Sequence, residues 1–87
     1  MLVVTLLLTF ALAPPLSEDV PFQEGLRLFD DYEYEKAVFR FREAAGVEDR
    51  PATERATIYV WLGMSYAGLG DFSAAGAAFD DAVALAP

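Results

Sequence analysis

Two stretches of this chain carry identical or similar residues at a constant separation, and this repetition constrains the fold more than any other feature. Gly63, Phe72, Ala75, Phe79 and Ala82 lie 38 residues after Gly25, Tyr34, Ala37, Phe41 and Ala44, respectively. Self-similarity at a fixed period of this length is typical of repeat proteins, in which each copy forms one supersecondary unit. The sequence therefore predicts an internal duplication.

Hydrophobic spacing predicts that the first copy is a pair of helices. Phe22 and Leu26 follow the i, i+4 spacing of one helical face in a first helix over about 21–30. A second helix is expected over about 33–45. Gly46 is expected to end it as a C-cap in the left-handed conformation that glycine adopts easily.

The second copy is also predicted to be a pair of helices. Pro51 is suited to starting its first helix at about Ala52. Gly70 is expected to end that helix with a positive φ, and Asp71 is expected to cap the next helix with its carboxylate. The chain is therefore expected to be all-α, with helix pairs at about 20–46 and 52–86.

A longer motif lies within the second copy. The residues that carry it are Tyr59, Leu62, Gly63, Tyr66, Ala75, Phe79 and Pro87, at the spacing W-x2-L-G-x2-Y, A-x3-F, P with tyrosine in the tryptophan position. This stretch resembles the tetratricopeptide repeat (TPR) family. The first copy keeps the second-helix positions but has Pro21, Glu24 and Leu28 at the tryptophan, leucine and tyrosine positions. We therefore interpret the first copy as a degenerate terminal repeat.

The resemblance implies a domain over 17–87 in which two antiparallel helix-turn-helix units stack as a short right-handed solenoid. Its structural motif residues would be Gly25, Ala37, Phe41, Ala44, Tyr59, Leu62, Gly63, Tyr66, Ala75, Phe79, Ala82 and Pro87. Gly63 would let the paired helix approach, and Phe79 would fill the space as a core side chain worth about 3–5 kcal/mol. The alternative is a plain four-helix bundle with coincidental spacing.

The resemblance also implies that the first helix of each pair lines a concave groove. The candidate partner-binding residues are Phe22, Leu26, Phe29, Val60, Met64 and Ala67. Because they are apolar, the groove would suit an amphipathic helix or an extended apolar peptide, with Met64 as an adaptable contact. The alternative is that the same side chains belong to the core. Trp61 is expected to pack against the preceding pair, with an interface anchor as its alternative role.

The first thirteen residues are uncharged and almost wholly apolar. As a helix they would span about 20 Å, less than the roughly 30 Å hydrocarbon core of a bilayer. Residues 1–16 are therefore predicted to be an export signal peptide or an uncleaved membrane-associated segment, although no Lys or Arg stands near the start and cleavage after Ala13 would expose Pro14. A soluble core helix and a misplaced start codon are the remaining interpretations. The protein is expected to be exported: periplasmic, cell-envelope or secreted.

Composition excludes several classes of function. The chain contains no cysteine and no histidine, which removes His-assisted catalysis and zinc sites built on those residues. A formal net charge of −8 disfavours binding to nucleic acid, which depends on clustered Lys and Arg. The acidic stretch 30–35 lacks the spacing of a calcium loop. We therefore expect no enzyme activity, no cofactor and no metal.

The function expected from these features is protein–protein interaction. The partner would be a protein or peptide, with self-association through exposed repeat faces as a second way to cover them. Contact with a membrane is expected only through residues 1–13, if they are not cleaved. Arrays of this kind usually need three or more repeats, so the alternative is an amino-terminal TPR fragment of a larger protein, such as an enzyme, whose active part lies beyond Pro87.

Overall fold

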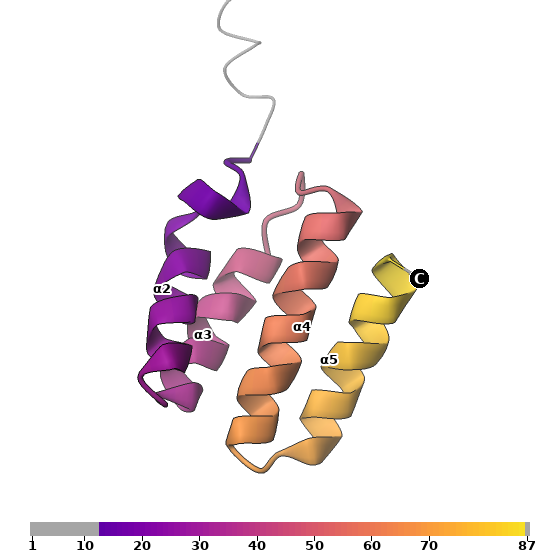
Figure 1. Cartoon of the computed structure of the whole chain (residues 1–87). Helices are drawn as coiled ribbons and strands as arrows, with labels where there is room; N and C mark the ends of the chain where they lie inside the picture. The colour runs from indigo at the N-terminus through magenta and orange to yellow at the C-terminus, as the bar shows by residue number, and fades with distance from the viewer. Residues whose placement is uncertain (1–12, 87) are drawn as a thin grey trace, which may run out of the picture.

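The computed structural model describes residues 13–86, which form four α-helices and a short 3₁₀-helix (Figure 1). In chain order these are η1 (Leu16–Glu18), α2 (Val20–Asp30), α3 (Tyr34–Ala45), α4 (Ala52–Gly68) and α5 (Phe72–Leu85). This part of the chain contains no strand, which confirms the predicted all-α class. Most of the predicted export segment, and Pro87 of the repeat motif, lie outside the described residues.

Aspartate side chains cap the amino ends of two helices. The Asp19 carboxylate accepts a hydrogen bond from the Phe22 N–H at 2.9 Å, and the Asp71 carboxylate accepts one from the Ala74 N–H at 3.1 Å. Each bond satisfies a donor that has no partner within its own helix. Gly70, directly before Asp71, has a φ of 79°, as predicted.

The predicted left-handed conformation at Gly46 is wrong. Gly46 is right-handed, with φ −76° and ψ −5°, and its N–H still donates to carbonyls of α3. The connection from α3 to α4 is long enough to change direction gradually, so no left-handed residue is needed there. The tight turn between α2 and α3 does need one, and Tyr32 takes it with a φ of 61°.

Successive helices pack against each other along the chain: α2 on α3, α3 on α4, and α4 on α5 (Figure 1). The first and third helices also meet, because the rings of Phe29 and Trp61 lie edge to face with centroids 5.2 Å apart. The ring centroids of Trp61 and Phe41 are also only 6.2 Å apart. The prediction that Trp61 packs against the preceding pair is therefore confirmed.

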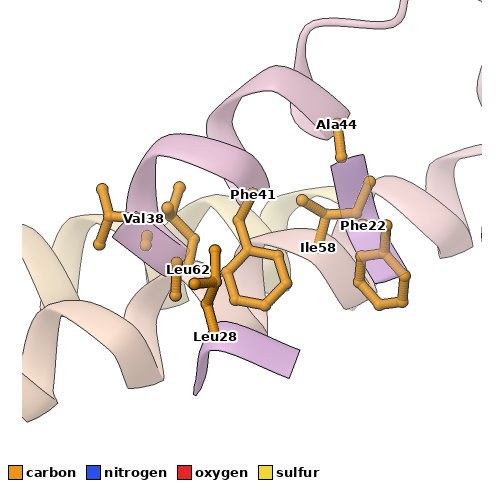
Figure 2. Packing of buried hydrophobic residues seen from close by; sticks show 9 residues of the cluster. Phe22, Leu28, Val38, Phe41, Ala44, Ile58 and Leu62 are labelled. Carbon is orange, nitrogen blue, oxygen red and sulfur yellow. The ribbon is translucent and has the colours of Figure 1, made fainter. Parts of the chain in front are cut away.

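The hydrophobic core lies between the first helix pair and α4, with Phe41 at its centre (Figure 2). Its buried members are Phe22, Leu28, Ala37, Val38, Phe41, Ala44, Ile58, Leu62 and Ala78. Phe41 has no exposed surface, whereas Phe79, its equivalent in the second copy, is 37% exposed. Phe79 lies over Gly63 as expected, but the prediction that it is a core side chain is wrong, because α4 covers Phe41 and none of the described helices covers Phe79 in the same way.

Glycines within the helices allow close approach of aromatic rings. A Cβ atom built on Gly25 would lie 2.5 Å from a ring carbon of Phe41, and one on Gly63 would lie 2.6 Å from a ring carbon of Phe79. A Cβ atom built on Gly68, at the end of α4, would lie 2.7 Å from a ring carbon of Tyr34. These distances are too short for any side chain other than glycine's hydrogen, so each ring occupies the place of a missing side chain.

Candidate partner-binding surface

An uncharged stripe runs along the outward side of α4. Its members are Thr57, Val60, Met64 and Ala67, which we call the α4 stripe. Val60 is 40% exposed and Met64 is 36% exposed, although both side chains are apolar. The Thr57 hydroxyl donates to the carbonyl of Thr53 at 3.0 Å, so the helix itself satisfies its polar group. A partner that covered the α4 stripe would therefore bury apolar surface without leaving a charge unpaired.

The predicted groove residues of α2 are less accessible than those of α4. Phe22 is 5% exposed and packs against Phe41 with ring centroids 5.7 Å apart, so it belongs to the core and not to a groove. The reason is that the turn of α2 that carries Phe22 faces α3. Leu26 and Phe29 are partly exposed, and the Phe29 ring is held between neighbouring rings, including that of Tyr34 at 5.2 Å.

Val60 also lines an open hollow of about 280 Å³ between α4 and α5. The full lining is Thr53, Ala56, Thr57 and Val60 from α4, with Ala82 and Val83 from α5 and Ala86 directly after it. Val83 is 64% exposed, yet it is not among the residues predicted to bind a partner. The available signal was a second uncharged stripe, because Phe79 and Val83 are four residues apart and face the same side of α5.

A buried ion pair lies at the end of the molecule where α2 and α4 begin. The Arg50 guanidinium donates to the Asp19 carboxylate at 2.8 Å and to the Pro14 carbonyl at 3.2 Å, and the Arg50 side chain has no exposed surface. Glu54 lies 3.6 Å from the same guanidinium. This buried cluster holds the segment before α2 against the start of α4.

The ion pairs that do not involve Arg50 lie at the surface of the described residues. Lys36 pairs with Glu33 at 3.3 Å and Arg40 with Glu43 at 2.8 Å, contacts that stabilise a surface only slightly. Over residues 13–86, no group of acidic side chains is arranged to hold a metal ion. In the same range, no helix combines the length and the apolar character that crossing a membrane requires.

Comparison with protein-family models, with curated proteins and with solved structures finds nothing that matches this chain. The feature of the chain itself that most favours a function is the exposed apolar surface of the α4 stripe.

Proposed function

We propose that this protein is a TPR-like interaction module that binds a peptide or helix of another protein on the α4 stripe, with Leu26 and Phe29 at its edge. The observation that carries the proposal is the exposure of Val60 and Met64, at 40% and 36%, on a helix whose opposite side is buried. Exposed apolar side chains that form a contiguous patch often mark protein–protein interaction sites.

The proposed stacking of two equivalent units, which we expect to be right-handed, is supported by three contacts. Within each unit the aromatic residue of the second helix lies over the glycine of the first: Phe41 over Gly25, and Phe79 over Gly63. Between the units, Phe29 of α2 meets Trp61 of α4. Repeated contacts within units, together with contacts between neighbouring units, are the packing that a repeat protein uses.

The charge of the chain favours a particular kind of partner. The chain as a whole carries a net charge of −8, so a helix with an apolar face and flanking Lys or Arg residues would associate fastest. Met64 suits such a surface because its unbranched, polarizable side chain adapts to different partners.

A binding experiment with selected peptides tests this proposal. Peptides selected by phage display on the wild-type chain serve as probes, and their affinity is measured by isothermal titration calorimetry. Met64→Glu should weaken binding by about ten-fold or more, because a buried charge without a partner costs more than 1 kcal/mol. Ala77→Glu, which adds the same charge at an exposed position of α5, is the matched control and should bind as wild type.

Two results would contradict the proposal. Selected peptides that bind both variants equally well would place recognition on another surface. A Met64→Glu variant that loses its helical circular dichroism would place Met64 in the core.

We also propose that the protein is exported, on the basis of the apolar residues 1–13. Amino-terminal sequencing of the protein recovered from cells tests this directly. A mature chain that begins after this segment supports cleavage, whereas an intact Met1 on protein recovered from the cytosol contradicts export.

A further inference from the structure

Tyr32 has a backbone conformation that tyrosine seldom adopts, and its ring gains little burial in return. Its φ is 61°, in the left-handed region where a Cβ atom is crowded by the backbone, and the residue is 79% exposed. The equivalent residue of the second copy is Gly70, which makes its turn without this cost. The helix pair therefore does not require tyrosine here. Strained residues of this kind are concentrated at functional sites.

The Tyr32 ring borders an open hollow of about 290 Å³ at the end of the molecule where the α2–α3 and α4–α5 turns lie (Figure 1). Its lining is Tyr32, Glu33, Tyr34, Glu35, Lys36 and Leu69. The ring of Tyr34 is held over Gly68 and against the ring of Phe29, 5.2 Å away. The ring of Tyr32 is set edge to face with that of Tyr34, at 6.3 Å. The hollow therefore has an aromatic wall that is fixed at one side by the core.

Negative charge predominates beside this wall. Residues 30–36 contain four carboxylates and one ammonium group, and that ammonium, on Lys36, is paired with Glu33 at 3.3 Å. Glu35 forms no ion pair with any other residue of the described range 13–86. Its equivalent in the second copy is Ser73, so the carboxylate is not part of the repeated pattern. The hollow therefore combines an exposed ring with a carboxylate that can accept hydrogen bonds from a ligand.

We propose that this hollow binds the side chain of an arginine residue of a partner protein. The lining offers a contact for each part of that side chain. The planar guanidinium stacks on the ring of Tyr32 through a cation–π interaction and donates two parallel hydrogen bonds to the Glu35 carboxylate. The methylene stem lies against Leu69, which is 48% exposed. A lysine ammonium is a point charge without the planar pair of donors, so the site favours arginine.

Titration of the full 87-residue chain with a matched pair of peptides tests the proposal. The probe is a blocked pentapeptide with arginine between two pairs of alanines. Its control has citrulline in place of arginine, which keeps the shape and removes the charge. Binding is followed by NMR at physiological salt, through the backbone amides of residues 33–36 and 69. The arginine peptide should bind at about millimolar concentration, and the citrulline peptide about ten-fold more weakly or less.

Variants of the lining separate the contribution of the ring from that of the carboxylate. Tyr32→Gly should raise the dissociation constant of the arginine peptide by about two- to five-fold, the effect of an exposed cation–π contact. Glycine relieves the strain at this φ, so unfolding would not explain the loss. Tyr32→Phe keeps the ring and should bind as wild type. Glu35→Gln should weaken binding by about three-fold or more. Glu48→Gln, at an exposed position of the α3–α4 connection, is the matched control and should bind as wild type.

Three results would overturn the proposal. Equal binding of the arginine and citrulline peptides would show that the hollow does not recognise the guanidinium. A Tyr32→Gly variant that binds as well as wild type would place the cation elsewhere. Methylguanidinium, which lacks the stem, would assign the hollow to a small guanidinium compound if it bound as tightly as the peptide. Peptide binding on the α4 stripe depends on Met64, which does not line the hollow, so the two proposals fail separately.

Discussion

A methyl group added at Gly25 would meet a ring that has no room to move. Its Cβ would lie 2.5 Å from Phe41, which is fully buried, whereas a Cβ at Gly63 would meet Phe79, which is 37% exposed and can turn outward. We expect Gly25→Ala to lower the free energy of unfolding by about 1–3 kcal/mol. Gly63→Ala should lower the free energy of unfolding less, because the clash with Phe79 is milder. The gain of about 1 kcal/mol in helix propensity then offsets a larger part of it. Urea unfolding followed by circular dichroism compares the two, and equal losses would contradict this difference in packing.

Tyr32 and Gly70 occupy equivalent turns and provide a second test. Tyr32 has a φ of 61° and Gly70 a φ of 79°. A residue other than glycine pays roughly 1–2 kcal/mol in this region. The exposed Tyr32 ring has one edge-to-face neighbour, Tyr34 at 6.3 Å, which recovers part of that cost. Tyr32→Gly should therefore raise the melting temperature, and Gly70→Ala should lower it. Changes of the same sign would show that the turns are not equivalent.

Only one of these two turns was evident from the sequence. Glycine followed by aspartate marks a helix end and a cap, so the geometry at Gly70 and Asp71 was predicted. Tyrosine carries no such signal, and a left-handed conformation was predicted at Gly46 instead. Tyr32 is the equivalent of Gly70 at the 38-residue offset. This equivalence could have identified Tyr32 as a residue with a positive φ.

At the scale of elements, the buried pair of Arg50 and Asp19 joins the start of α2 to the start of α4. Arg50→Met removes the positive charge and leaves a carboxylate that is 6% exposed without its ion partner. We expect a loss of about 3 kcal/mol or more in the free energy of unfolding, as is usual when one partner of a buried pair is removed. Arg40→Met is the control: the Arg40 side chain is 36% exposed, and the loss should stay below about 1 kcal/mol. Similar losses in urea unfolding would show that the Arg50 pair is accessible to water.

Local spacing predicted the helices but not the contacts that determine how the helices pack against one another. The period of apolar residues identified the apolar stripes of α2 correctly, yet it did not show which stripe another helix would cover, and so Phe22 was assigned to a groove. The contact between Arg50 and Asp19 spans 31 residues and leaves no local pattern. The α4 stripe was easier to predict, because Val60 and Met64 follow from the repeat motif once its packing positions are known.

At the scale of the whole molecule, the two helix pairs are equivalent in sequence but not in burial. The first pair is covered by α4, so Phe41 is fully buried and Ala45 partly buried. Their equivalents, Phe79 and Val83, are 37% and 64% exposed. A repeated pattern predicts the same role for each copy, but among residues 13–86 no helix covers α5 as α4 covers α3.

This asymmetry predicts different results for the same substitution in the two pairs. Phe41→Ala should cost about 3–5 kcal/mol, which equals what a single core of this size supplies, so its helical circular dichroism should disappear at room temperature. Phe79→Ala removes a ring that is already partly in water and should cost about 1–2 kcal/mol, which leaves the helices folded. Phe39→Ala, at a ring that is 64% exposed, is the control and should melt as wild type. If Phe79→Ala is as damaging as Phe41→Ala, the outer face of α5 is covered in solution, and the exposed edge of the isolated chain is an interface on which folding depends.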